Sequence, residues 1–126
     1  MPGTSLALLA GLGFVPTAFS ASLIASHYTG KLYSLSFNPS SGSNALAITG
    51  QVTGCGSLPA WLELYPADNT VYCFDESWYG SGTMASFSVA SDGKLTLKNQ
   101  AKTSGNDVHG VLYGGSDGKG FAASAQ

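Results

Sequence analysis

The hairpin-like stretch Leu58–Ser77 recurs about fifty residues later in the chain, at Asp107–Gln126. The first copy reads LPAWLELYPADNTVYCFDES: an apolar run, a polar turn, and a second apolar run that ends in two acids. The second copy, DVHGVLYGGSDGKGFAASAQ, follows the same plan. A strand-built repeat with this period predicts a propeller-like array. The aligned pairs are Trp61 with His109 and Tyr65 with Tyr113, both 48 positions apart, and Val71 with Phe121 and Glu76 with Gln126, both 50 apart.

Short runs with alternating polarity fill the rest of the chain and predict an all-β fold, because no segment outside the first twenty residues shows a helical period. Unit one has three strands and lacks its first, inner strand, unit two is complete with four, and unit three is only begun. Four strands are the content of one propeller blade. The expected strands of units one and two are Ser22–Tyr28, Lys31–Asn38, Ala45–Val52, Ala60–Tyr65, Thr70–Phe74, Thr83–Val89 and Lys94–Lys102.

The charge pattern excludes some partners. Only 10% of the residues are charged and the net charge is −2, so nothing attracts a nucleic acid or an anionic membrane. The chain contains no arginine. A site that grips a carboxylate through a bidentate guanidinium therefore cannot be built from this chain alone. No cofactor motif and no metal-ligand cluster is evident, because the Gly-rich stretches precede no helix and the acids do not alternate as in calcium loops.

The first twenty residues are apolar and predict a signal peptide or another apolar leader, followed by a single domain over residues 21–126. Leu6–Val15 forms the apolar run, and Ala18-Phe19-Ser20 ends it in a small-x-small pattern. A membrane span is disfavoured because glycines and Pro16 interrupt a run that is shorter than the roughly 20 residues needed. We therefore expect a secreted protein, with a cytoplasmic location as the alternative.

Cys55 and Cys73 could form a bridge in a secreted protein. Pairing across the Pro66–Asn69 turn, however, places Cys73 near Glu63, several residues from Cys55. A bridge requires the two Cα atoms to lie within about 7 Å. The hairpin therefore favours two free thiols, and the spacing matches no zinc or redox motif.

Three ordered segments carry a family resemblance: the hairpin PAWLELYPADNTVYCFDE, the strand pair around GTMASFSVASDGKL, and DVHGVLYGGSDGKGFAASA. Together they resemble the lactonase family of seven-bladed propellers, which includes 6-phosphogluconolactonases and fungal carboxy-cis,cis-muconate cyclases. The resemblance covers about residues 22–126. It implies an N-terminal fragment of about two and a half blades, in which a strand from the end of the intact protein would complete blade one.

The resemblance implies a function in which the intact relative opens or forms a lactone ring at the central channel. A small lactone or a muconate-like carboxylate would be the ligand. This chain alone is expected to be inactive without the other blades, so its status as a muconate cyclase (an isomerase) or a lactonase (a hydrolase) stays open. The alternative is a secreted, non-catalytic binding protein or an inactive truncated product. Open blade edges would also invite self-association.

The candidate catalytic residues are His109 and Glu76. His109 begins the strand that lines the channel in such propellers, where an imidazole could exchange protons near pH 7, or brace a loop instead. Glu76 stands where the resemblance places an acid. Neighbouring Asp75 points to the opposite face, so the two cannot form a carboxylate pair, and one of them should be solvated. The other candidates are His27 for a role at the channel end, Trp61 for packing between blades or covering the channel, and Trp78 and Tyr79 for stacking.

Overall fold

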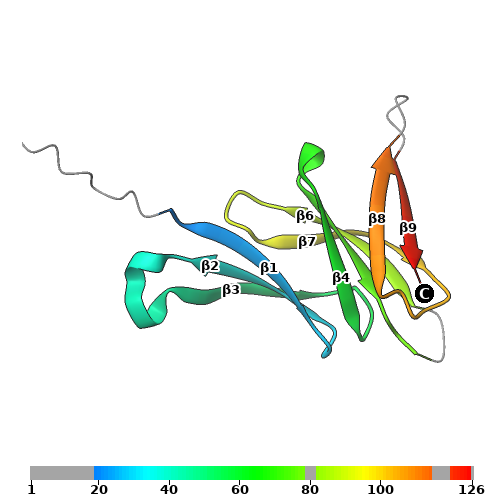
Figure 1. Cartoon of the computed structure of the whole chain (residues 1–126), viewed down its shortest axis with the longest axis horizontal. Helices are drawn as coiled ribbons and strands as arrows, with labels where there is room; N and C mark the ends of the chain where they lie inside the picture. Colours follow the sequence, from blue (N-terminus) through cyan, green and yellow to red (C-terminus); the bar gives the residue numbers. More distant parts are fainter. Residues whose placement is uncertain (1–18, 79–81, 115–119, 126) are drawn as a thin grey trace, which may run out of the picture.

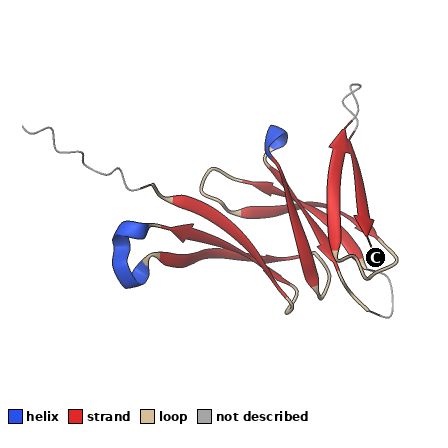
Figure 2. Ribbon diagram, in the orientation of Figure 1, coloured by secondary structure: helices blue, strands red, loops and turns tan. Residues whose placement is uncertain are grey.

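The computed structural model describes residues 19–78, 82–114 and 120–125. The strands form three antiparallel sheets that lie side by side (Figures 1 and 2), which confirms the predicted partial propeller. We call the sheets blades 1, 2 and 3. Blade 1 contains β1 (Ala21–His27), β2 (Lys31–Phe37) and β3 (Leu46–Thr53); blade 2 contains β4 (Pro59–Tyr65), β5 (Thr70–Asp75), β6 (Thr83–Val89) and β7 (Leu95–Lys102); blade 3 contains β8 (His109–Gly114) and β9 (Gly120–Ala125).

The connections follow the local sequence. Two short 3-10 helices, η1 (Pro39–Asn44) and η2 (Pro66–Asp68), connect β2 to β3 and β4 to β5, and both begin at a proline whose fixed φ suits a first helical position. Gly93 ends the Asp-Gly turn with φ +81, a value that a residue with a side chain rarely adopts. Within the described residues, no helix is long and apolar enough to cross a membrane. The predicted leader falls on residues 1–20, of which residues 1–18 lie outside the described part.

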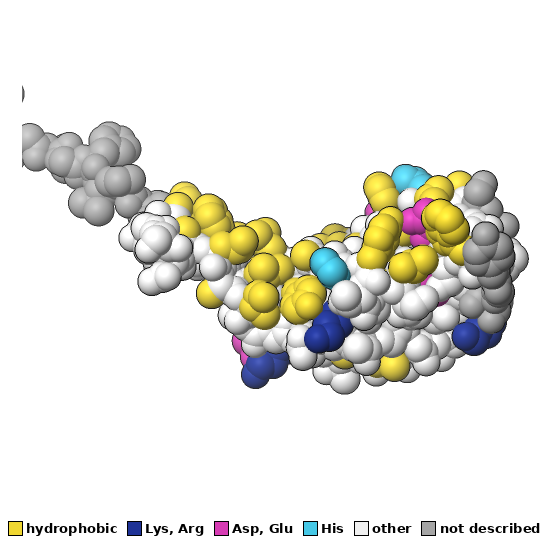
Figure 3. All heavy atoms as spheres, turned by 90° about the horizontal axis from the view of Figure 1, so that it is seen from below, with side chains coloured by type: hydrophobic (Ala, Val, Ile, Leu, Met, Phe, Trp, Pro, Cys, Tyr) yellow, Lys and Arg dark blue, Asp and Glu magenta, His cyan; other side chains and the backbone are white. Residues whose placement is uncertain are grey.

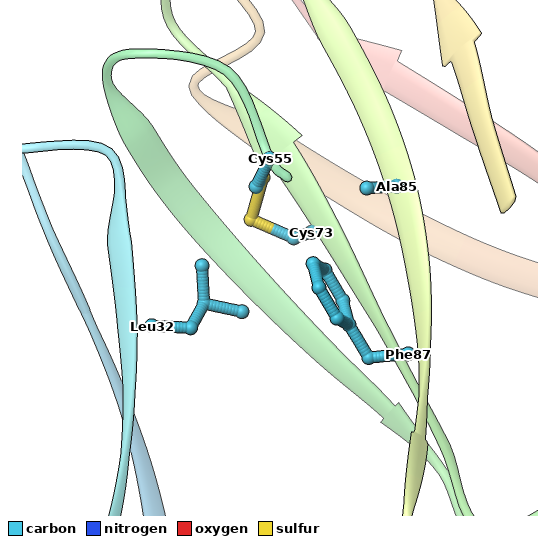
Figure 4. Close-up of a cluster of buried hydrophobic side chains, with 5 residues drawn as sticks. All are labelled: Leu32, Cys55, Cys73, Ala85 and Phe87. Atoms are coloured by element: carbon cyan, nitrogen blue, oxygen red, sulfur yellow. A yellow bond between two sulfur atoms is a disulfide. The ribbon is translucent and has the colours of Figure 1, made fainter. Parts of the chain in front are cut away.

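Blades 1 and 2 pack face to face around a small core. The front face of blade 2 carries Val71, Cys73, Ala85 and Phe87, and it is turned toward the back face of blade 1, where Leu32 is fully buried. Figure 4 shows Leu32 reaching toward Phe87 and the two cysteines. In each blade, alternate residues of a strand point to the front or to the back. A polar contact supports the same packing: the hydroxyl of Ser34 on the back face of blade 1 donates to the Gly93 carbonyl oxygen at 2.8 Å.

The prediction of two free thiols is wrong. Cys55 and Cys73 form a disulfide with Cα atoms 5.9 Å apart (Figure 4), and both residues are fully buried. Cys73 lies opposite Leu62 rather than Glu63, and its side chain points to the front face. The loop after β3 folds back over that face and carries Cys55 to it. The prediction judged the distance between the two cysteines from the strand pairing of the hairpin alone and did not consider that the loop between β3 and β4 brings Cys55 back onto this face.

Blades 2 and 3 meet through the back face of blade 2 and the front face of blade 3. The ring of Phe74 is fully buried and lies against the backbone of Gly110: a methyl group on Gly110 would stand 2.3 Å from the ring atoms Cε2 and Cζ. Asp107 ties the end of blade 2 to blade 3. Its buried carboxylate accepts hydrogen bonds from the hydroxyls of Thr103 and Ser124, the latter at 2.6 Å.

The repeat alignment is correct for the first strand of unit three but one residue off for the second. Val111 pairs with Ala123 where Glu63 pairs with Tyr72, so β9 is offset from β5 by 51 positions rather than 50. A slip of one residue moves every side chain to the other face of the sheet. Phe121 therefore belongs to the back face of blade 3, opposite Tyr113, and does not correspond to the buried Val71.

Candidate functional site

Several strand ends meet at one rim of the three blades. The first strand of blade 2, β4, contacts both β1 and β8, so these three strands lie closest to the axis around which the blades are arranged. Pro59 at the start of β4 pairs with Asp75 at the end of β5, and His109 at the start of β8 pairs with Ala125. We call the end of the molecule where these positions lie the rim. It carries both candidate catalytic residues, His109 and Glu76.

His109 lies against Trp61. The two ring centroids are 4.1 Å apart and the ring planes are inclined at 41°. The indole N–H of Trp61 donates to the Glu63 carboxylate at 3.3 Å, which holds the indole in place. His109 itself is exposed, so one edge of its imidazole is open to solvent. Trp61 therefore packs between blades, as predicted, and its ring forms a platform that positions the imidazole.

Glu76 is bound by a residue of the preceding blade. The phenol of Tyr28 donates to Oε2 of Glu76 at 2.7 Å, across 48 positions of sequence. Trp61 and His109 are also 48 positions apart. Each contact thus joins equivalent positions of two successive blades. The rim carries one aromatic–imidazole pair and one phenol–carboxylate pair, built on the same repeat geometry.

The three sheets, and the rim contacts that join equivalent positions of successive blades, agree with the comparison with protein families. The family model "Lactonase, 7-bladed beta-propeller" matches residues 22–126. The chain belongs to this family. No curated protein and no solved structure matches the chain.

Of the two adjacent acids, Asp75 is the one that is shielded from solvent, and its contacts give it a structural role. Asp75 is buried, and its Oδ1 accepts from the backbone N–H groups of Leu58 and Ser77 at 2.9 and 3.2 Å. Its Oδ2 accepts from the Ser77 hydroxyl at 2.6 Å. A methyl group on Gly56 would stand 1.9 Å from Oδ2, so the loop before β4 closes directly over this carboxylate. Asp75 braces the rim, and Glu76, half-buried beside it, is the acid that stays accessible.

The remaining predicted rim residues are placed as follows. His27 ends β1, and its Nδ1 lies 3.0 Å from the Thr29 hydroxyl, a local contact within one turn. Trp78 is largely exposed in the loop after β5, and no stacking partner is seen for it among the described residues. Tyr79 lies outside the described residues. Among the described residues, no hydrogen bond or ring contact joins His27 or Trp78 to His109 or Glu76.

An open groove of about 290 Å³ runs along the rim between blades 1 and 2. It is lined by Ser26, His27, Tyr28, Pro59 and Ala60, so the phenol that binds Glu76 forms part of its wall. A second hollow, of about 320 Å³, lies at the opposite end between blades 2 and 3. We regard the rim groove as the candidate site. Among the described residues that line the second hollow, the only acid is Asp68, which already faces the ammonium of Lys98 at 3.8 Å.

Two residues of the rim were missed by the sequence reasoning. Tyr28 was assigned to a strand without a role, although it precedes Glu76 by one repeat. Glu63 follows Trp61 by two positions, the spacing that places two side chains on the same face of a strand. Both signals were present in the repeat. Among the residues that the structure describes, no three His, Cys, Asp or Glu side chains form a group suited to a metal ion.

The Tyr28–Glu76 contact predicts a titration that can be measured. The hydrogen bond to Glu76, reinforced by the negative charge of that carboxylate, raises the pKa of Tyr28 above its ordinary value of 10.0. A pKa that is higher in the folded state gives stability that is complete below about pH 10 and is lost as the pH rises through the folded-state pKa. We expect Glu76→Gln to lower the pKa of Tyr28 toward its ordinary value, as measured by NMR titration of the Tyr28 ring.

Asp92→Asn is the matched control, because Asp92 is an exposed acid whose partner is Lys94 at 3.2 Å. This variant should leave the titration of Tyr28 unchanged. If Glu76→Gln also leaves it unchanged, the contact between Tyr28 and Glu76 is not formed in solution.

Proposed function

We propose that this chain supplies the N-terminal blades of a secreted lactonase-type propeller, and that the rim with His109 and Glu76 belongs to the site where a lactone ring is opened or formed. The single observation that carries the proposal is the pairing of Trp61 with His109 at 4.1 Å on the innermost strands. That contact presents an exposed imidazole beside the axis of the propeller, where a substrate in the central channel would meet it.

The chemistry needs one group that can both accept and donate a proton. In the hydrolytic direction, neutral His109 takes a proton from water as the water oxygen attacks the lactone carbonyl carbon. The bond between that carbon and the ring oxygen then breaks, and the imidazolium returns the proton to the leaving alkoxide. A muconate cyclisation uses the same group differently: a substrate carboxylate oxygen adds to the double bond, and the imidazolium protonates the neighbouring carbon. Both schemes suit an imidazole near neutral pH.

Glu76 has a positioning role in this proposal. Its carboxylate accepts a hydrogen bond from the Tyr28 hydroxyl at 2.7 Å and so holds the phenol along the groove wall. The free lone pairs of the carboxylate remain available to a hydroxyl group of a sugar-like lactone. No arginine is present to bind a substrate carboxylate, so full turnover would require groups from further blades.

A secreted, non-catalytic binding protein or an inactive truncated product is the second candidate. The buried Cys55–Cys73 disulfide favours secretion, because such bonds persist in oxidising compartments and are rare in the cytosol. The absence of arginine favours a protein without catalytic activity. The two candidates differ in what the rim binds: a ring-opening site must bind lactones, and a surface-binding protein need not.

Lactone binding is the test. We expect glucono-δ-lactone to shift the NMR signals of the Trp61 indole N–H and the His109 ring saturably, with a dissociation constant on the order of millimolar and little or no turnover. His109→Gln and Glu76→Gln should each weaken binding about tenfold, the effect of losing one hydrogen bond of about 1.4 kcal/mol.

Asp68→Asn is the control, because it makes the same acid-to-amide change at the opposite end of the molecule. It should leave binding intact, and gluconate should bind less well than the lactone. Failure of lactones to shift either rim signal would contradict the proposal. Hydrolysis by the folded monomer above the buffer rate would instead show that further blades are not required.

A further inference from the structure

The position of the exposed His109 depends on how β8 begins. Figure 3 views the molecule from the rim and shows histidine side chains at the surface. On its inner side the imidazole lies against the Trp61 indole, with the ring centroids 4.1 Å apart. The imidazole therefore stays on the indole only if the backbone at the start of β8 is fixed. Asp107, two positions before His109, is fully buried and takes no part in the chemistry proposed above.

The carboxylate of Asp107 joins two segments behind the rim. It accepts a hydrogen bond from the hydroxyl of Thr103, which directly follows β7, and another at 2.6 Å from the hydroxyl of Ser124 on β9. Ser124 pairs with Gly110, the residue after His109. The carboxylate thus ties the loop that enters blade 3 to the strand beside β8. Because a buried carboxylate is costly to leave without its donors, these hydrogen bonds hold the loop firmly.

A disulfide joins the same two repeat positions at the junction between blades 1 and 2. Thr103 follows Cys55 by 48 positions. Ser124 holds the position of Cys73, by the offset of 51 that the strand register gives between β5 and β9. Both bridges tie the loop that enters a blade to the second strand of that blade. The junction between blades 2 and 3 therefore has a polar bridge through Asp107 where the preceding junction has a covalent one.

The bridged loop also contacts the segment that carries the other candidate residue. The backbone N–H of Asn106 donates to the carbonyl oxygen of Ser77, the residue after Glu76, at 3.2 Å. Asn106 has φ 59, a left-handed conformation that is uncommon for a residue with a side chain. At the end of the loop, the backbone N–H of Val108 donates to the carbonyl oxygen of Ala125 at 3.1 Å. The loop thus fixes the start of β8 relative to Glu76.

We infer that Asp107 is a positioning residue of the candidate site: it holds the start of β8 so that the His109 imidazole stays on the Trp61 indole. Its hydrogen bonds to Thr103 and Ser124 impose this constraint. The carboxylate is buried, so it acts through His109 rather than on a ligand. The effect on lactone binding rests on the proposed function, whereas the placement of the imidazole does not.

The NMR signals of the His109 ring test this role in the full chain without ligand, because the ring current of the Trp61 indole shifts protons that lie against it. In Asp107→Ala these signals should move toward those of an imidazole surrounded by water. Ser124→Ala leaves the carboxylate in place and removes one hydrogen bond, so it should move them in the same direction by a smaller amount. Ser124→Thr keeps a hydroxyl and should retain the wild-type signals.

Ser34→Ala is the matched control. It also removes a hydroxyl that donates a hydrogen bond between blades, but at the junction between blades 1 and 2. The His109 signals should therefore stay at their wild-type positions in this variant. If Asp107→Ala does not fold, the comparison of Ser124→Ala, Ser124→Thr and Ser34→Ala carries the test.

Lactone binding then shows whether Asp107 acts through His109. Asp107→Ala should weaken the binding of glucono-δ-lactone by no more than the roughly tenfold loss expected for His109→Gln. Adding Asp107→Ala to His109→Gln should cause no further loss, because the group that Asp107 places is already gone. Losses that add fully in the double variant would overturn an action through His109.

Unchanged His109 signals in both Asp107→Ala and Ser124→Ala would overturn the positioning role, even in a chain that binds lactones. Equal movement in Ser124→Ala and Ser34→Ala would also overturn it, because the change would then report a general loosening of the blades. A chain that binds no lactone but whose His109 signals move as expected would contradict the proposed function and support the placement of the imidazole by Asp107.

Discussion

Phe74→Ala is expected to lower the free energy of unfolding by about 3–5 kcal/mol, the usual cost of deleting a buried aromatic ring. The ring is fully buried and fills the space over Gly110, so its loss leaves a cavity between blades 2 and 3. Because small domains are stable by only about 5–15 kcal/mol, this variant would be partly unfolded under mild conditions. Urea unfolding followed by Trp fluorescence measures the loss.

A second variant and a control keep this prediction testable if Phe74→Ala does not fold. Phe74→Leu retains most of the volume and should cost less than about 1.5 kcal/mol. Phe121→Ala removes the same ring from a half-exposed position and should change stability by no more than about 0.5 kcal/mol. Equal losses for Phe74→Ala and Phe121→Ala would show that the two blades do not pack through Phe74.

The contact between Phe74 and Gly110 also predicts a coupling. Gly110→Ala places a methyl group 2.3 Å from the ring and should cost about 1–3 kcal/mol through overpacking. In a Phe74→Leu background the cost should fall, because the planar ring that opposes the methyl group is gone. A double-mutant cycle measures the difference, and strict additivity would place the two residues apart.

Removal of the disulfide is expected to cost about 3 kcal/mol. Cys55 and Cys73 are 18 positions apart, and closing a loop of that length restricts the unfolded chain by about this amount. The double variant Cys55→Ala/Cys73→Ala should therefore unfold at lower urea concentration. Wild-type protein measured with a strong reductant should match it. Both cysteines are buried in the core between blades 1 and 2, so we expect reduction to be slow until the chain opens.

Reductant gives the internal control. It should destabilise the wild type and leave the double variant unchanged. If the variant and the oxidised wild type unfold at the same urea concentration, the bridge contributes nothing and the core alone holds the two blades together.

The fold was largely predictable because the sequence repeat indicates the number and order of the strands in each blade. Alternating polarity predicted both ends of every strand in blades 1 and 2 to within one residue, and the spacing of 48 aligned β4 with β8. A blade is a local structure whose strands follow one another in sequence, so local patterns suffice. The exact length of the final hairpin was not predictable in this way. The mostly small side chains of β9 are all exposed and mark no preferred face, so its register could not be read from the sequence.

The candidate site was predictable where two contacting residues occupy equivalent positions of successive repeats. It was unpredictable where the contacts depend on the path of the loop between blades 1 and 2. Trp61 and His109 share a repeat position, so their contact follows from the array, and Tyr28 with Glu76 obeys the same rule. The disulfide and the buried role of Asp75 both depend on the loop between blades 1 and 2. Its path follows from tertiary packing that no periodicity encodes.

The rim contacts limit how similar successive repeats can be. Because position 28 touches position 76 one unit later, copying the same residue into both places would create a like-with-like contact. Two carboxylates at the 2.7 Å separation of this pair would repel each other, and one would have to remain protonated. A chain that arose from identical units would therefore be driven to diverge first at these positions, and the Tyr–Glu and Trp–His pairs are the complementary outcome.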